Sequence, residues 1–180
     1  MSHMKVLRIF GASLLLTSVA LGGVALAQSP ISALRGHNTN APIDVSADRI
    51  EVQDRADRAI WSGNVQVRQD QLTLEAQRLT LAYTTAGGLE IDRLDASGGV
   101  VVRSPSETAR GNFGVYDINR RLITLVGGVR LERGGSSLSG ARLTIDLSSG
   151  RAVVDGGAAG IGESGGRVTG RFIVPQRSGS

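Results

Sequence analysis

Residues 63–67 read Gly-Asn-Val-Gln-Val, and residues 127–131 read Gly-Gly-Val-Arg-Leu. In the first stretch Val65 and Val67 fall on one side of an extended chain, and Gln66 falls on the other. A two-residue period with one apolar face predicts an antiparallel strand that buries one side. These two stretches set the pattern for the rest of the chain.

The same alternation continues from Pro42 to residue 147, and no stretch there sustains a 3.6-residue period over three turns. Gly, Asp, Asn and Ser separate the runs and predict turns at 54–57, 86–88, 97–99, 117–119, 134–135 and 148–150. The expected inward residues are Ile43 and Val45, Ile50 and Val52, Leu72 and Leu74, Leu79, Leu81 and Tyr83, Leu89 and Ile91, Val100 and Val102, Phe113 and Val115, Val129 and Leu131, and Leu143, Ile145 and Leu147. Short strands with frequent turn signals predict an all-β sandwich, barrel or roll.

The sequence also repeats itself after a shift of 64 residues without a gap. Gly63 then meets Gly127, and Arg78-Leu79-Thr80 meets Arg142-Leu143-Thr144. A repeated pair of strands predicts a quasi-linear stack in which each pair contacts its neighbours. Such a stack has two open ends with unpaired backbone groups, which need caps or act as docking edges.

The N-terminal region predicts export. Lys5 and Arg8 precede an apolar stretch that ends in Ala25-Leu26-Ala27, a small-x-small cleavage site. We therefore expect a signal peptide over 1–27, a flexible leader over 28–41, one domain over 42–176 and a disordered tail over 177–180. An uncleaved membrane anchor is the alternative, because the apolar run is just long enough to span a bilayer.

Composition excludes several classes of site. The chain has no Cys and two His, His3 and His37, both outside the alternating region. Thiolate and His-based metal sites and a Ser-His-Asp triad are therefore not expected, and we expect no cofactor. Arg is scattered and aromatic residues are few, which disfavours nucleic-acid binding.

Catalysis finds little support in the sequence, and we expect no enzymatic activity. Asp54 and Asp57 form a carboxylate pair, but they lie in a turn beside Arg residues. Gly156-Gly157 and Gly160-Ile161-Gly162 lack the following Lys-Ser/Thr of a phosphate-binding loop.

Several segments in a fixed order resemble the OstA-like family of periplasmic lipopolysaccharide transport proteins. The segments are Pro42 to Asp48, Gly63 to Val67, Leu74 to Leu79, Leu125 to Leu131 and Gly166 to Pro175. The resemblance covers about 42–176 and implies a rolled antiparallel β-jellyroll. The chain departs from the family in two respects. It is richer in Gly and Arg and poorer in Lys and aromatic residues than expected, and the turn of its second repeat is Gly127-Gly128 where the first repeat has Gly63-Asn64.

The resemblance implies a periplasmic bridge that shields the acyl chains of lipopolysaccharide or a related glycolipid. Its implied partners are an inner-membrane bitopic protein, an outer-membrane jellyroll and further copies of the chain, stacked head to tail.

An aliphatic trough suits such a ligand, because each CH₂ group removed from water contributes roughly 0.8 kcal/mol. The residues expected to line the trough are Ile43, Val45, Val52, Leu74, Leu81, Val102, Phe113, Val115, Tyr116, Leu143 and Ile145. Tyr116 breaks parity with Val115 and is the least regular member.

Two rival hypotheses remain open at this stage. The same apolar face can be the closed core of a structural envelope or adhesion module, and an uncleaved N-terminus would make the chain a membrane-anchored relative. Several Arg residues could meet an anionic head group, but most stand on the outward half of the alternation or in turns beside acidic residues, which favours a solvated surface: Arg49, Arg55, Arg58, Arg120, Arg121, Arg130 and Arg133.

Overall fold

The computed structural model describes residues 37–157 and 166–174, and within them the chain forms one antiparallel sheet of ten strands. The strands are β1 (Asp44–Ser46), β2 (Arg49–Gln53), β3 (Arg58–Gln69), β4 (Leu72–Thr84), β5 (Glu90–Arg103), β6 (Glu107–Asp117), β7 (Leu122–Arg133), β8 (Ser136–Asp146), β9 (Arg151–Asp155) and β10 (Thr169–Arg171). A single 3₁₀ turn, η1 (Asp54–Ala56), lies between β2 and β3 in the described part of the chain. The expected signal peptide and most of the expected leader lie outside the described residues.

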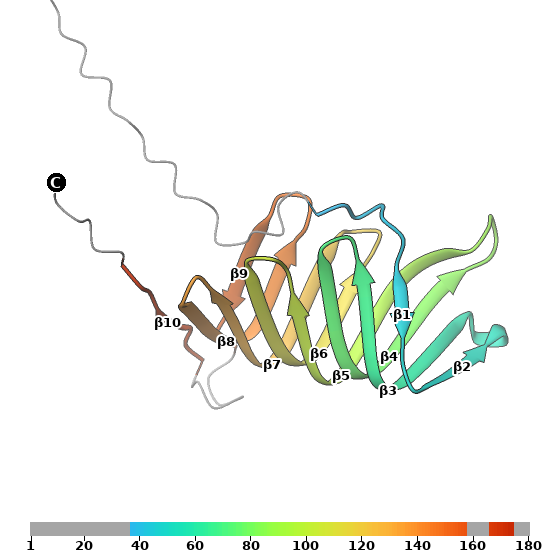
Figure 1. The fold of residues 1–180 in the computed structure, drawn as a ribbon, viewed down its shortest axis with the longest axis horizontal. Helices are drawn as coiled ribbons and strands as arrows, with labels where there is room; N and C mark the ends of the chain where they lie inside the picture. Colours follow the sequence, from blue (N-terminus) through green and yellow to red (C-terminus); the bar gives the residue numbers. More distant parts are fainter. Residues whose placement is uncertain (1–36, 158–165, 175–180) are drawn as a thin grey trace, which may run out of the picture.

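The strands follow one another as a meander, and Figure 1 shows them as a row of similar hairpins. The six long strands β3 to β8 pair in sequence order. At one end β1 and β2 pair with different parts of β3, and at the other end β10 and β9 pair with different parts of β8. The sheet does not close on itself, so the expected all-β roll with open ends is confirmed.

A column of β-bulges bends every long strand near its middle. Residues 63–64 of β3, 98–99 of β5 and 127–128 of β7 interrupt the pairing register, each opposite a single residue of the next strand. Asn64 has φ 47° and Gly128 has φ 59°, so both adopt the left-handed conformation that Asn and Gly tolerate best. The replacement of Asn64 by Gly128 in the second repeat therefore preserves the backbone geometry.

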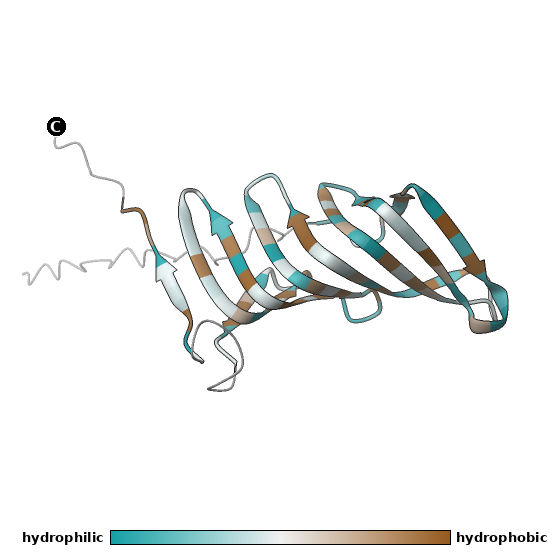
Figure 2. Cartoon of the chain, turned by 90° about the horizontal axis from the view of Figure 1, so that it is seen from below, coloured by the Kyte–Doolittle hydropathy of each residue, from teal (hydrophilic) through white to brown (hydrophobic). Residues whose placement is uncertain are grey.

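The bulges divide the sheet into two arms that face each other. The first arm contains β1, β10 and the strand parts 65–69, 72–76, 100–103, 107–111, 129–133 and 136–140. The second arm contains β2, β9 and the parts 58–62, 78–84, 90–97, 113–117, 122–126 and 142–146. One continuous apolar core fills the space between them. In Figure 2 hydrophobic and hydrophilic residues alternate along the strands.

Two local expectations were wrong. Residues 97–99 were expected to form a turn, but they lie inside β5 as part of the bulge column. Paired glycines with positive φ serve bulges as well as turns, so the sequence signal is the same. Leu89 was expected to face inward, but it precedes β5 and is 73% exposed.

Candidate functional site

Inward residues line up in continuous rows that cross the whole sheet. Directly paired residues of neighbouring antiparallel strands point to the same face, so each row can be followed from the pairing register. The first ladder lies on the first arm and runs Val45, Val67, Leu74, Val102, Ala109, Leu131, Leu138 and Gly170, from β1 to β10.

The second ladder lies on the second arm, facing the first. It runs Val52, Ala59, Leu81, Leu94, Tyr116, Ile123, Ile145 and Ala152, from β2 to β9. A third ladder lies on the same arm, two residues nearer the bulges: Ile50, Trp61, Leu79, Ala96, Gly114, Leu125, Leu143 and Val154. Together the ladders make an almost wholly apolar interior from one end of the roll to the other.

This interior is closed in the middle and exposed at its ends. Leu94, Ile123 and Ile145 in the second ladder are each 1% exposed, whereas Val52 at its start on β2 is 57% exposed. At the opposite end Phe172, just after β10, is 64% exposed. The two ends of the roll therefore present apolar side chains that an added strand or an amphiphile can cover.

Nine of the eleven residues expected to line a trough belong to this interior. Val45, Leu74 and Val102 lie on the first ladder, Val52, Leu81, Tyr116 and Ile145 on the second, Leu143 on the third, and Ile43 packs beside the core. All except Ile43, Val45 and Val52 are buried, so the middle of the expected trough is a packed core in this structure.

The inward assignment of Phe113 and Val115 was wrong. Phe113 is 56% exposed and pairs with Ser97, and Val115 pairs with Asp95 on the outer face. Asn112 lies opposite the two-residue bulges of β5 and β7, and Asn112 and Phe113 both face outward, which reverses the alternation along β6. Tyr116, the residue that broke the expected parity, is therefore the inward one.

Polar residues at the rim of the interior were missed. Gln69 ends the inward row Val65, Val67, Gln69 and is 2% exposed. Its Oε1 accepts a hydrogen bond from the Tyr116 hydroxyl at 2.9 Å. The signal was present in the sequence, because Gln69 stands on the inward phase of the alternation.

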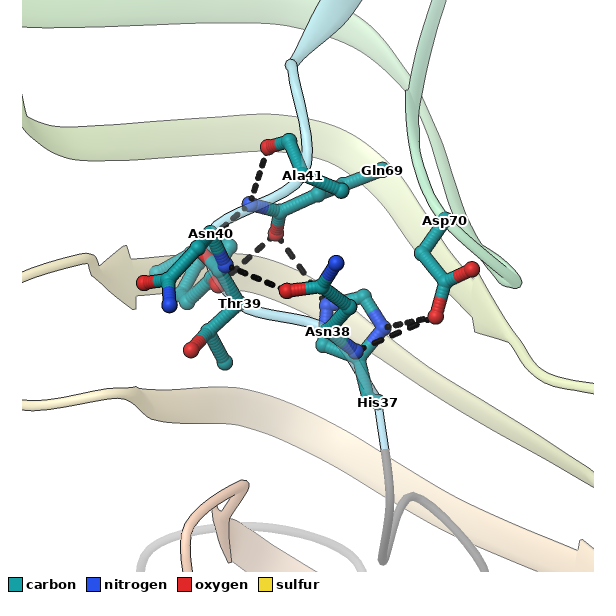
Figure 3. A network of polar contacts seen from close by, with 8 residues as sticks. His37, Asn38, Thr39, Asn40, Ala41, Gln69 and Asp70 are labelled. Atoms are coloured by element: carbon teal, nitrogen blue, oxygen red, sulfur yellow. Dashed lines mark hydrogen bonds and ion pairs between the residues drawn. The ribbon is translucent and has the colours of Figure 1, made fainter.

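Residues 37–41, the last part of the expected flexible leader, contact Gln69 and Asp70. The Gln69 Nε2 donates to the carbonyl oxygens of Thr39 (3.0 Å) and Ala41 (3.1 Å). The Asn38 N–H donates to Asp70 Oδ2 at 3.1 Å, and His37 Nε2 lies 3.2 Å from Gln69 Oε1 (Figure 3). His37, outside the alternating region, is therefore part of the rim.

Electrostatics separate the interior from the outer face. Burial raises the pKa of Tyr116 to about 12, against a smaller opposing effect of Arg121, so its hydroxyl stays protonated at neutral pH. On the outer face, hydrogen bonds from Arg110 and Arg130 lower the pKa of Glu132.

The arginines that could have met an anionic head group include several in ion pairs: Arg130 with Glu132, Arg120 with Asp117 and Arg133 with Glu107. Arg120 and Arg130 are thus solvated surface residues, whereas Arg133 pairs with buried Glu107 at the rim.

Near β10 the rim is hollowed. A cleft of about 690 Å³ is lined by polar residues that include Ser104, Arg133 and Arg171. An adjoining pocket of about 320 Å³ shares Arg133 and is lined by Leu131, Leu138 and Phe172. The first ladder is thus reachable from this end.

No group of three or more His, Cys, Asp or Glu side chains that could hold a metal ion occurs among residues 37–157 and 166–174. In the same ranges no helix has the length and hydropathy needed to cross a membrane.

Comparison with known proteins agrees with this architecture. The profile of the family described as LptA/(LptD N-terminal domain) LPS transport protein matches residues 44–151. The chain belongs to this family.

An uncharacterized protein of Rhizobium meliloti (strain 1021) is 31% identical over 144 residues, which cover 75% of this chain and 77% of the relative. The crystal structure of LptH from Pseudomonas aeruginosa, the LptA homologous periplasmic component of its lipopolysaccharide transport device, superposes with a TM-score of 0.65. It covers 76% of this chain and 98% of LptH at 19% identity, which shows a shared fold. The expected OstA-like family and β-jellyroll are therefore confirmed.

Proposed function

We propose that this chain is a periplasmic bridge protein that shields the acyl chains of lipopolysaccharide or a related glycolipid between the ladders of the two facing arms. The observation that carries the proposal is the continuity of these ladders, each across eight of the ten strands, with exposed apolar residues at both ends. Aliphatic walls suit such a ligand because they recover the free energy of burying many CH₂ groups without a specific polar pocket.

The ends of the roll support assembly with other jellyrolls. At one end β1 and β2, and at the other β10 and β9, are the last strands of the two arms. Unpaired strand edges join to further strands by backbone hydrogen bonds, so head-to-tail stacking with copies or with membrane-bound jellyroll partners would continue both ladders. In this role the chain acts as a carrier without catalysis, and its N-terminal segment directs it to the periplasm.

Photo-crosslinking tests lipid capture with a matched pair of positions. Val52 and Phe113 are equally exposed, at 57% and 56%, but Val52 belongs to the second ladder and Phe113 to the outer face. We expect a crosslinker at Val52 to capture lipopolysaccharide mixed with the purified protein, and one at Phe113 to capture none. Equal capture at both positions would indicate nonspecific adhesion, and capture at neither would reject lipid binding.

The closed structural module is the second candidate, and the packing of the middle of the interior favours it. Buried residues such as Leu125 and Leu143 have no exposed surface. If this core never opens, Val52→Asp at the exposed end and Phe113→Asp outside should both leave lipid recovery unchanged. If the ladders carry lipid, Val52→Asp should reduce recovery and Phe113→Asp should not.

A further inference from the structure

On the side of the roll opposite the bulges, a buried hydrogen bond between Gln69 and Tyr116 joins the two arms. Gln69 is on the first arm, just before the β3–β4 turn, and Tyr116 is on the second arm, just before the β6–β7 turn. The 2.9 Å bond between them therefore spans the seam opposite the bulges. In Figure 1 this seam is the rim where the hairpin turns of both arms gather, and the segment before β1 runs along it.

The hydrogen-bonding capacity of Gln69 fixes how this link is built. Carbonyl oxygens only accept, so the amide nitrogen must face Thr39 and Ala41, and the amide oxygen must face Tyr116 and His37. The Tyr116 hydroxyl and the Nε2–H of His37 then donate to the amide oxygen. One side chain thus ties β3, β6 and residues 37–41 together, and Figure 3 shows its contacts with residues 37–41.

Such a link has two discrete states. While it is intact, Gln69 and Tyr116 are satisfied away from water at 2% and 3% exposure. If residues 37–41 leave, Gln69 loses two carbonyl acceptors, and if the arms also part, water can replace every lost bond. The state between these two, with the groups buried but unpaired, is unfavourable, so the segment and the seam should open together.

We propose that residues 37–41, Gln69 and Tyr116 form a seam latch, which holds the arms closed and admits acyl chains sideways when it releases. The inference rests on the proposed function, because lipid is what would enter. It adds a lateral route, controlled by the segment before β1, to the route through the ends of the roll.

A reversible disulfide tests the latch. The chain has no Cys, so Asn38→Cys with Asp70→Cys introduces a single possible bond where the Asn38 N–H now meets the Asp70 carboxylate. Uptake is followed by the anisotropy of fluorescently labelled lipopolysaccharide after rapid mixing, with the same protein oxidised and then reduced. We expect oxidation to slow uptake at least tenfold and the reductant to restore it.

A conservative variant tests the other side of the latch. Tyr116→Phe keeps the ring in the second ladder and removes the hydroxyl, so uptake should become several times faster. Tyr83→Phe is the matched control, because Tyr83 is the other Tyr of the chain and its hydroxyl bonds to Asp54 at a distance from the seam. Circular dichroism checks that both variants keep the β-sheet.

The outcomes separate the two proposals. Equal uptake by the oxidised and reduced proteins, or failure of the disulfide to form, would overturn the latch while leaving lipid carriage intact. No uptake by any form, together with no crosslinking at Val52, would overturn lipid carriage and the role of the latch with it.

Discussion

The hairpin of β3 and β4 and the hairpin of β7 and β8 have the same bulged pairing pattern, but their side chains differ at the rim. A shift of 64 residues places Gln69 on Arg133. Gln69 bonds across the seam to Tyr116, whereas Arg133 lies 3.7 Å from Glu107 on its own arm and lines an open cleft. The comparison teaches that the bulges and ladders set the shape of the roll, while the last inward side chain of each repeat decides whether its rim is closed.

The largest expected effect tests whether the two repeats contribute equally to the core. Leu79 of β4 and Leu143 of β8 both belong to the third ladder, correspond through the shift of 64 residues, and are both 0% exposed. Leu79→Ala and Leu143→Ala should each lower the free energy of unfolding by about 3 kcal/mol, through lost burial and a residual cavity. Urea denaturation measures both, and a difference of more than about 2 kcal/mol would show that the repeats are not energetically equivalent.

The next effect concerns how the free energy of unfolding depends on pH through Tyr116. The pKa of Tyr116 is about 12 in the folded chain against an ordinary 10.0. Because the folded state holds this proton more tightly, its contribution is fully present below pH 10 and is lost as the pH rises through 12. The loss should reach about 3 kcal/mol, since each pKa unit corresponds to about 1.4 kcal/mol.

Denaturation across this alkaline range, with Tyr116→Phe as comparison, checks the assignment. The variant should be less stable by about 1 kcal/mol at neutral pH, where it lacks one hydrogen bond, and should show a flatter alkaline decline. An unchanged decline in Tyr116→Phe would assign the titration to other groups.

A third effect compares the inward-facing Gln69 with the outward-facing Gln66 of the same strand. Gln69→Ala removes the acceptor of the Tyr116 hydroxyl and the donor to two carbonyl oxygens, and should cost about 2 kcal/mol in the free energy of unfolding. Gln66→Ala, on the outward phase of the same strand, should cost less than about 0.5 kcal/mol. Similar costs for both variants would mean that water replaces the buried network.

The sequence predicts the ladders within each arm but not the step from one arm to the other. Period-two alternation places Leu79, Leu81, Leu143 and Ile145 inward, as the structure has them. The inward phase reverses in β6 between Asn112 and Phe113, opposite the two-residue bulges of β5 and β7, and no side chain in β6 announces it. The opposite strand carries the signal, in Gly98-Gly99 and Gly127-Gly128, but paired glycines are equally typical of turns.

The sequence alternation predicts the apolar rows of the candidate site but not its polar rim. Gln69 was missed because a single polar residue at an inward position can mean either that the strand ends there or that the group is buried with hydrogen-bond partners. Its partners lie far away in sequence, at Tyr116 and in 37–41, and only tertiary structure brings them together. Arg133 stands at the corresponding inward position of the second repeat, but it lines an open cleft. The alternation of apolar and polar residues therefore does not tell a closed rim from an open one.

The smallest expected effect returns to the bulge that the repeats share. Asn64 and Gly128 occupy matching positions with left-handed backbone, so Gly128→Asn should change the free energy of unfolding by less than about 0.5 kcal/mol. Gly127→Ala is the contrasting change one residue earlier. Gly127 has φ 81°, and an added Cβ would lie 3.0 Å from the Asn112 side chain, so this substitution should cost about 2 kcal/mol. Urea denaturation of the two variants measures the difference, and a costly Gly128→Asn would mean that the two bulges differ in more than the residue that fills them.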